Sequence, residues 1–215
     1  MLKIKRIINE VFNSNTFILY TDDEPSVYLI DPGNLKETLT WMNNKGKNEV
    51  KGILLTHTHF DHIYRVNDFL ELYPDCILYV SSNHGKVYLA DEKKNFSRYH
   101  EFPIIVSHHY IQELVNKEKF LLWNKLDITC FHTPGHSPDS VCYFVEKCLL
   151  TGDTLIENVR TVTKLRGGSK SDLFFSISDI EKLKGNNIMV YPGHNESFCL
   201  DKYYLYKSLD SNTNL

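Results

Sequence analysis

The 215-residue chain has the length of one larger single-core domain, and its hydrophobic fraction of 42% is enough for a packed core. Charged residues make up 24%, close to the globular average, which argues against disorder. The formal net charge of −3 gives no general attraction to nucleic acid or to an anionic membrane, so we expect neither as a partner and expect one domain over residues 1–215.

The amino-terminal segment contains no long apolar run. Only two or three apolar residues stand together before Asn9 and Glu10. A secretory signal or a membrane span needs a longer apolar stretch, so we expect a cytoplasmic protein. The five cysteines form no C-x-x-C pair, which favours free, buried thiols over a disulfide framework.

The first part of the chain predicts short strands and two helices. Runs of β-branched and aromatic residues, or short apolar runs, predict strands at residues 16–21, 26–31, 50–56 and 76–80. Apolar residues at helical spacing predict helices over residues 35–42 and 63–73. The strand over residues 50–56 leads directly into His57.

Residues 83–118 are polar and rich in aromatic side chains, with helical spacing around Ile111–Val115. We expect this stretch to be an insertion that forms a lid or a pocket wall, because long inserted segments often shape sites.

The second half of the chain predicts further strands at residues 126–132, 140–145, 148–151 and 188–191. Ser178 and Glu181 have capping-box spacing, which predicts a short helix ending at Gly185. Because many strands are hairpin-linked, the order predicts two sheets packed face to face with helices outside, an α/β (α+β) architecture.

The motif that carries chemistry is Thr-His-Thr-His-Phe-Asp-His, with His57, His59, Asp61 and His62 inside six residues. In extended or loop backbone, His57 and His59 point to the same side, so one metal ion can take both. Asp61 and His62 follow as the chain turns into a helix and can face a second ion. Imidazole with carboxylate is the ligand set expected of Zn²⁺, and also of Fe or Mn.

Three more ligand-type residues stand where predicted strands give way to loops. They are His136 in Pro-Gly-His, Asp153 in Gly-Asp, and His194 in a second Pro-Gly-His. Each follows a glycine, which allows a tight turn and a close approach of the backbone to an ion. An isolated Pro-Gly-His is usually a plain turn, but with the first motif these residues complete an inventory for two metal ions.

The order of these motifs, from Asp31-Pro-Gly to His194, resembles the metallo-β-lactamase superfamily, and its glyoxalase II-like (hydroxyacylglutathione hydrolase-like) branch above all. The resemblance implies a four-layer αββα sandwich. It implies one metal ion on His57, His59 and His136, and a second on Asp61, His62 and His194. Asp153 would bridge the two ions, and Asp31 would orient the first histidine loop without being a ligand.

The implied activity is hydrolysis of a small ester, thioester or related acyl substrate by hydroxide that two Zn²⁺ ions activate. Asp61 and Asp153 are the expected catalytic carboxylates. Two alternatives stay open: a persulfide dioxygenase with one Fe(II), and a non-catalytic metal-binding protein of the same fold. All seven ligand positions are intact, which argues against the non-catalytic reading because such polar groups are costly to keep together.

Substrate identity is less defined by the sequence. Asn195-Glu196 stands where glyoxalase II enzymes carry Glu-Tyr, whose tyrosine contacts glutathione, and this argues against a glutathione thioester. Lys164 and Arg166 lie beside a Gly-Gly pair and are our expected contacts for an anionic substrate group. A solvated basic loop is an equally good interpretation of these two residues.

Overall fold

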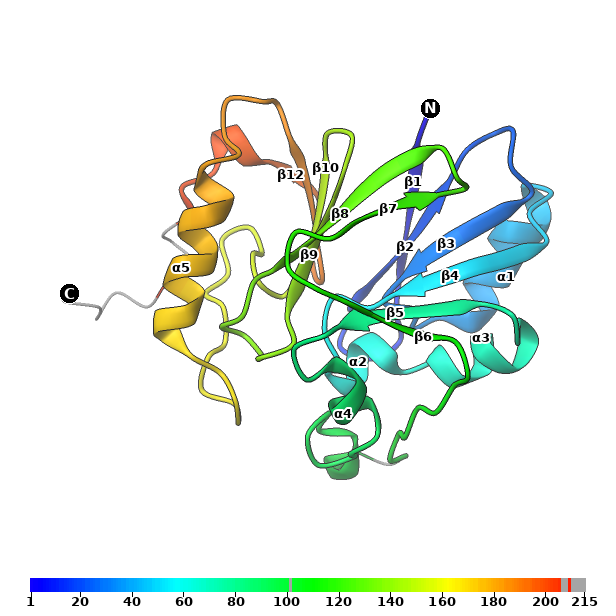
Figure 1. Cartoon of the computed structure of the whole chain (residues 1–215), viewed down its shortest axis with the longest axis horizontal. Coiled ribbons are helices and arrows are strands. Elements are labelled where there is room, and N and C mark those ends of the chain that lie inside the picture. The colour runs from blue at the N-terminus through cyan, green and yellow to red at the C-terminus, as the bar shows by residue number, and fades with distance from the viewer. Residues whose placement is uncertain (101, 206–208, 210–215) are drawn as a thin grey trace. The chain divides into compact units, whose positions relative to one another are not determined.

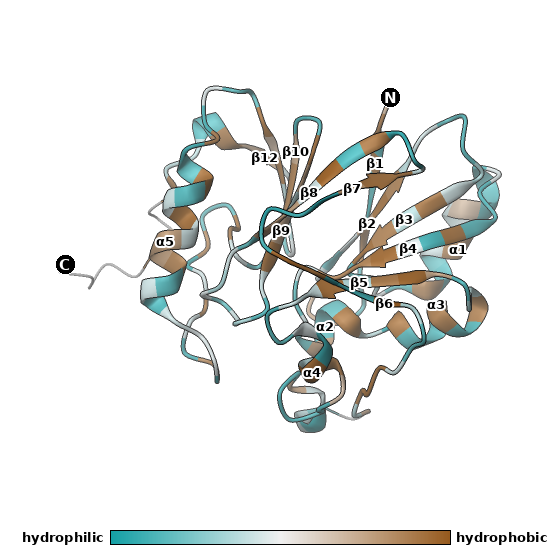
Figure 2. Cartoon of the chain, viewed as in Figure 1, coloured by the Kyte–Doolittle hydropathy of each residue, from teal (hydrophilic) through white to brown (hydrophobic). Residues whose placement is uncertain are grey.

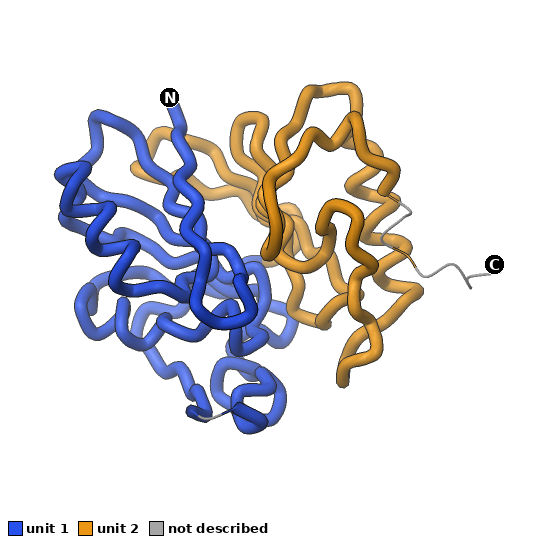
Figure 3. The backbone as a smooth tube through the Cα atoms, turned by 180° about the vertical axis from the view of Figure 1, so that it is seen from behind, with its two compact units in different colours: residues 1–114 blue, residues 115–215 orange. Residues whose placement is uncertain are grey.

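The structure is a computed structural model that describes residues 1–100, 102–205 and 209. It divides into two compact units, Met1–Leu114 and Val115–Leu215, each built around one sheet (Figure 3). The expectation of one domain over residues 1–215 stays a prediction. No helix in the described ranges is long and apolar enough to cross a membrane.

The sheet of the first unit has six strands, labelled in Figure 1 and ordered as in the chain. They are β1 (Lys3–Ile8), β2 (Asn15–Tyr20), β3 (Ser26–Ile30), β4 (Glu49–Leu54), β5 (Ile77–Ser81) and β6 (Ile111–Leu114). The first three are antiparallel, and β3 to β6 are parallel. Parallel neighbours need crossover connections, which place helices on the sheet faces.

The connections of the first unit carry short helices. These are α1 (Leu35–Asn44), α2 (Phe60–Ile63), α3 (Val66–Leu72), α4 (Gly85–Leu89) and the 3₁₀ turn η1 (Ser97–Tyr99). Helix α1 is capped by Asn34, whose side-chain Oδ1 accepts a hydrogen bond from the Glu37 amide at 3.1 Å. Apolar side chains of the helices join those of the strands in one core, which includes Ile53, Phe69 and Leu78.

Two predictions for this unit were wrong in part. The single helix expected over residues 63–73 is broken between α2 and α3, where the Arg65 amide donates to the Pro32 carbonyl at 3.1 Å. The helical spacing at Ile111–Val115 belongs to a strand, because β6 pairs with β5 in the register Leu78↔Ile111. Both differences come from contacts with distant segments, which local periodicity does not contain.

The sheet of the second unit has the order β12-β11-β10-β9-β8-β7. Its strands are β7 (Lys119–Leu122), β8 (Leu126–His132), β9 (Val141–Val145), β10 (Cys148–Gly152), β11 (Met189–Pro192) and β12 (Phe198–Cys199), followed by the 3₁₀ turn η2 (Leu200–Lys202). All neighbours are antiparallel except β10 and β11, which are parallel.

One helix, α5 (Lys170–Glu181), packs on this sheet. Figure 2 shows hydrophobic and hydrophilic residues alternating along it, and its buried Leu173, Ile177 and Ile180 join Cys142 and Leu149 of the strands. The amphipathic pattern therefore accounts for how the helix covers the sheet.

The predicted helix start at Ser178 was wrong. The helix begins after Ser169, whose hydroxyl oxygen accepts a hydrogen bond from the Asp172 amide at 3.2 Å. Ser178 lies in the later turns, and its hydroxyl donates to the Phe174 carbonyl at 2.8 Å. A serine hydroxyl is able to cap a helix N-terminus, and inside a helix it is able to donate to the carbonyl one turn earlier. The residue spacing alone therefore does not distinguish the two positions. The five cysteines are free, as predicted. Cys76, Cys130 and Cys142 are also buried, whereas Cys148 and Cys199 are only partly buried.

Candidate metal centre

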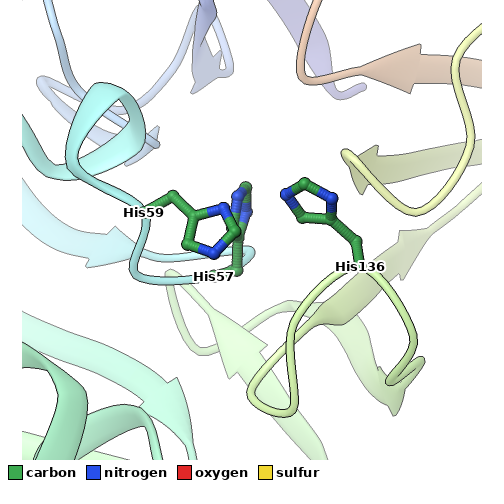
Figure 4. Close-up of side chains that lie close together, drawn as sticks. All are labelled: His57, His59 and His136. Atoms are coloured by element: carbon green, nitrogen blue, oxygen red, sulfur yellow. The ribbon is translucent and has the colours of Figure 1, made fainter. Parts of the chain in front are cut away.

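The loop after β4 and the helix α2 that follows it carry three imidazoles of the first unit close together. The rings of His57 and His59 have centroids 4.7 Å apart (Figure 4), and those of His57 and His62 are 4.1 Å apart. All three side chains are buried. His59 is in extended conformation directly before α2, so the chain turns between His59 and His62. This brings together the histidines that the motif predicted as ligands within this unit.

Asp31 holds this loop from the end of β3. Its carboxylate accepts the Thr56 amide at 2.8 Å and the Thr56 hydroxyl at 2.5 Å, and it lies 2.9 Å from Nδ1 of His62. Burial raises the pKa of Asp31, while its hydrogen bonds to His62 and Thr56 act in the opposite direction. An Nδ1–H donated to Asp31 turns Nε2 of His62 into the ring atom that is able to coordinate a metal.

Asp61 lies on α2, with Oδ2 3.5 Å from Nε2 of His62. Its backbone carbonyl accepts the Ser14 hydroxyl at 2.8 Å, and Asn9 Nδ2 donates to the same Ser14 oxygen at 3.0 Å. These buried groups connect the β1–β2 turn to the ligand helix. Gly33 permits the arrangement, because a Cβ there would lie 2.4 Å from Cγ of Asn9. Sequence reasoning did not find Asn9 or Ser14, which belong to no motif.

Residues 83–118, apart from Glu101, which lies outside the described residues, contain α4, η1 and β6. The His100 ring stacks on Phe60 of α2, with ring centroids 3.5 Å apart and an interplanar angle of 16°. Phe12 contacts Phe60 edge-on at 5.3 Å. This segment therefore packs against the helix that carries Asp61 and His62, and its role as a lid or a wall remains a prediction.

In the second unit, His136 stands on the loop after β8, shown in Figure 4. Gly135 precedes it with φ +143°, and a Cβ there would lie 2.5 Å from the Leu173 backbone of α5. The turn therefore requires glycine for both conformation and space. His136 Nδ1 lies 2.8 Å from the Val162 carbonyl, to which it donates, so Nε2 is the nitrogen that can face a metal.

Asp153 and His194 follow two neighbouring parallel strands, β10 and β11, whose carboxyl ends lie together. The Gly193 amide donates to the Gly152 carbonyl at 2.8 Å, which ties the two loops. Asp153 Oδ2 lies 3.5 Å from His194 Nε2 and 3.7 Å from His136 Nε2. The structure thus brings two predicted ligands of the second unit, His136 and His194, close to one carboxylate oxygen of the third, Asp153.

A pocket of about 260 Å³ opens beside these three residues. Its other lining residues are Ile156, Val159, Arg160, Thr161, Val162 and Asn195. The lining does not include Lys164 or Arg166, our expected contacts for a substrate anion. Arg160 lines it instead.

The model of the metallo-β-lactamase superfamily matches residues 9–194 of the chain. The chain belongs to the metallo-β-lactamase superfamily. The predicted family is therefore confirmed. So is the fold class, a mixed α/β fold of the metallo-β-lactamase type with two sheets.

Members of the metallo-β-lactamase superfamily resemble the chain over most of its length. It is 30% identical to the probable metallo-hydrolase YqgX of Bacillus subtilis, over 90% of each chain. It is 27% identical to the mitochondrial hydroxyacylglutathione hydrolase of Saccharomyces cerevisiae, over 88% of this chain and 65% of that protein. The crystal structure of the BLEG-1 B3 metallo-β-lactamase matches with a TM-score of 0.82 and 30% identity, over 92% of this chain and 94% of the other.

The donors in both units fit a metal of the kind this superfamily binds. Imidazole nitrogens and carboxylate oxygens are the donors that zinc and iron take in proteins. Three of the histidines, His57, His62 and His136, have Nδ1 against a protein oxygen, an arrangement typical of metal-ligating histidines.

Proposed function

We propose that the chain is a dinuclear metal-dependent hydrolase that acts on a small ester, thioester or related acyl substrate. The observation that carries the proposal is the set of histidines whose Nδ1 atoms face Asp31 and the Val162 carbonyl. Such bonds fix the tautomer in which Nε2 coordinates a metal, and a structural histidine has no need of this pattern repeated in two units.

The ligand assignment is part of the proposal. His57, His59 and His136 would hold one ion, and Asp61, His62 and His194 the other. Asp153 would bridge them, in keeping with its Oδ2 lying between Nε2 of His136 and Nε2 of His194. Zn²⁺ is the proposed metal because a histidine-rich set with carboxylates suits it well. The same donors also bind iron, so the metal must be measured.

Two such ions, when bound, lower the pKa of a shared water toward neutrality and polarise a substrate carbonyl. The chain's own residues orient the ligands and handle the proton. Asp31 keeps the first histidine loop in its ligating orientation through Thr56 and His62. Asp61 would accept a proton from an attacking water, and the Ser14 hydroxyl donates to the backbone carbonyl of Asp61.

The deciding measurement is the metal content per chain by elemental mass spectrometry, on protein purified without chelator or histidine tag. About two zinc ions per chain, with hydrolysis of an ester or thioester panel, is the expected result. About one iron per chain, with oxygen consumption on a persulfide, would replace the proposal by a dioxygenase. Absence of bound metal would overturn the proposal in every form.

Substituting Asp153→Asn tests the bridging role. An amide has one coordinating oxygen and no charge, so we expect turnover to fall below detection and the metal content to drop. Unchanged turnover would contradict the assignment of Asp153. Asp201→Asn is the control: this exposed acid accepts hydrogen bonds from the Gly185 and Asn187 amides and is not one of the proposed ligands, so the variant should retain wild-type metal content.

A further inference from the structure

A second cavity, of about 220 Å³, lies between the sheet of the second unit and the carboxyl end of α5. Three neighbouring strands supply its floor, with Phe131 from β8, Cys142 from β9 and Leu149 from β10. Ile180 and Leu183 close it on the helix side. None of the predicted metal ligands belongs to its described lining, and neither does any described residue around the other pocket. The cavity is therefore separate from the candidate metal centre.

The charged groups at this cavity are unbalanced. Two lysines and one aspartate, Lys117, Lys182 and Asp179, belong to its described lining. The Lys182 ammonium donates to the Asp179 carboxylate at 2.5 Å, so these two charges offset each other. Lys117 is exposed, and its ammonium forms no hydrogen bond or ion pair with another described residue. One positive charge therefore remains available beside an apolar floor.

The turn that carries Lys117 is fixed against β8. The Lys117 amide donates to the Cys130 carbonyl at 2.7 Å, and the His132 amide donates to Oδ1 of Asn116 at 3.0 Å. Lys117 has φ +64°, in the left-handed region that residues other than glycine rarely adopt. Because the bonds to β8 hold the chain in this turn, the lysine projects from a fixed point at the edge of the cavity.

We infer that this cavity binds a short-chain carboxylic acid, with the alkyl chain between the sheet and α5 and the carboxylate at Lys117. Binding removes the apolar surface of the alkyl chain from water. The single unbalanced ammonium matches the charge of a monoanion, and its three donors suit carboxylate oxygens. The inference goes beyond the proposed hydrolase function and does not depend on it.

The cavity volume limits the size of the acid. At about 220 Å³ it lies below the usual range of roughly 300–1,000 Å³ for sites that enclose drug-sized ligands. A chain of the length of hexanoate suits this space, whereas the end of a longer chain would stay in solvent. We accordingly expect the affinity to rise from butanoate to hexanoate and to gain little from hexanoate to decanoate.

Calorimetric titration of the full chain, purified with its metal, with hexanoate and with the uncharged hexanamide tests the site. We expect the wild type to bind hexanoate about three- to fivefold more tightly than hexanamide, a modest factor because ion pairs at exposed lysines are weak. In Lys117→Gln this difference should vanish, and in Lys117→Arg it should remain. The matched control is Lys119→Gln. Lys119 is also exposed and lies two residues further along, but outside the described lining, so this variant should keep the difference.

Leu183→Trp tests the apolar part of the cavity. A larger ring at this half-buried position fills the space, so neither hexanoate nor hexanamide should bind measurably. Circular dichroism checks the fold of the variant. If the variant does not fold, the exposed Lys117 and Lys119 variants decide the question by themselves.

Several results would overturn the inference. One is absence of hexanoate binding to the wild type, and another is equal affinity of the wild type for hexanoate and hexanamide. Loss of the difference in Lys119→Gln as well as in Lys117→Gln would show that general positive charge attracts the acid. Hexanoate binding that neither Lys117→Gln nor Leu183→Trp changes would place the acid elsewhere, such as on the bound metal.

Discussion

The ring of Phe96 packs edge-on against the ring of His59, with centroids 5.0 Å apart and an interplanar angle of 77°. Phe96 adopts φ +65°, and two fully buried polar residues flank it. Asn95 donates from Nδ2 to the Ile104 carbonyl at 2.8 Å, and the Ser97 hydroxyl accepts the Ile104 amide at 2.7 Å. The loop is therefore built to hold an aromatic side chain against a predicted metal ligand.

We predict that Phe96→Ala changes substrate choice and leaves metal content intact. Loss of the ring removes an apolar wall beside His59 without touching a donor atom, so KM for esters with bulky acyl groups should rise several-fold. The control is Tyr110→Ala, an exposed aromatic of the same 83–118 segment. If Phe96→Ala loses bound metal as well as its substrate choice, the ring has a structural role instead.

Asp31→Asn should weaken metal binding about 10- to 100-fold, the range typical of losing a group that hydrogen-bonds to the non-coordinating nitrogen of a ligating histidine. Asparagine tolerates the positive φ of +48° at this position, so the backbone need not move. Competition with a chelator gives the affinity, and circular dichroism checks the fold. If affinity is unchanged, Asp31 serves folding alone. Thr56→Val removes the hydroxyl that bonds to the Asp31 carboxylate and lies 3.1 Å from Nδ1 of His57. It should give a smaller effect, because Asp31 still contacts His62.

Gly135→Ala should destabilise the protein by at least about 2 kcal/mol, because a methyl group would overlap the Leu173 backbone of α5. Gly185→Ala is the matched control. Gly185 also has a positive φ, +86°, but open space surrounds its Cβ position, so only the conformational cost of about 1 kcal/mol applies. Urea unfolding of the metal-free proteins measures both, and equal costs would contradict the steric argument.

Stability should fall as pH rises above 9. Burial raises the pKa of the Cys76 thiol from 9.0 to about 12, and burial likewise raises that of Tyr79 to about 12. Between the pKa of a thiol in the unfolded chain and its raised pKa in the folded chain, the unfolded chain has lost a proton that the folded chain retains, so the free energy of unfolding decreases as pH rises. The stabilising contribution of the buried, protonated Cys76 is fully present below pH 9 and is lost as pH passes about 12. Urea midpoints at pH 8 and 10.5 test this, and Cys76→Ala should reduce the pH slope.

The sequence by itself determined the donor types and their order. His57, His59, Asp61 and His62 form one dense motif, and the glycines before His136, Asp153 and His194 mark turns that only small residues allow. Such information is local, because it lies in residue type and in spacing over a few positions. For the same reason the apolar strands that lead into each motif were largely predicted, whereas β1 and β7, which carry mixed polar patterns, were not.

Only the tertiary structure decided which residues hydrogen-bond to the predicted metal ligands and which lie beside them. The bond from His136 to the Val162 carbonyl joins residues 26 apart, and no motif pointed to Val162. The resemblance implied that Asp31 orients the first histidine loop, but the particular bond to His62, 31 residues away, came from the structure. The parallel pairing of β10 with β11 places Asp153 beside His194, and the pocket beside them is lined by Arg160 and by neither Lys164 nor Arg166. Contacts of this kind depend on strand pairing and packing between distant segments, which no local pattern of residues encodes.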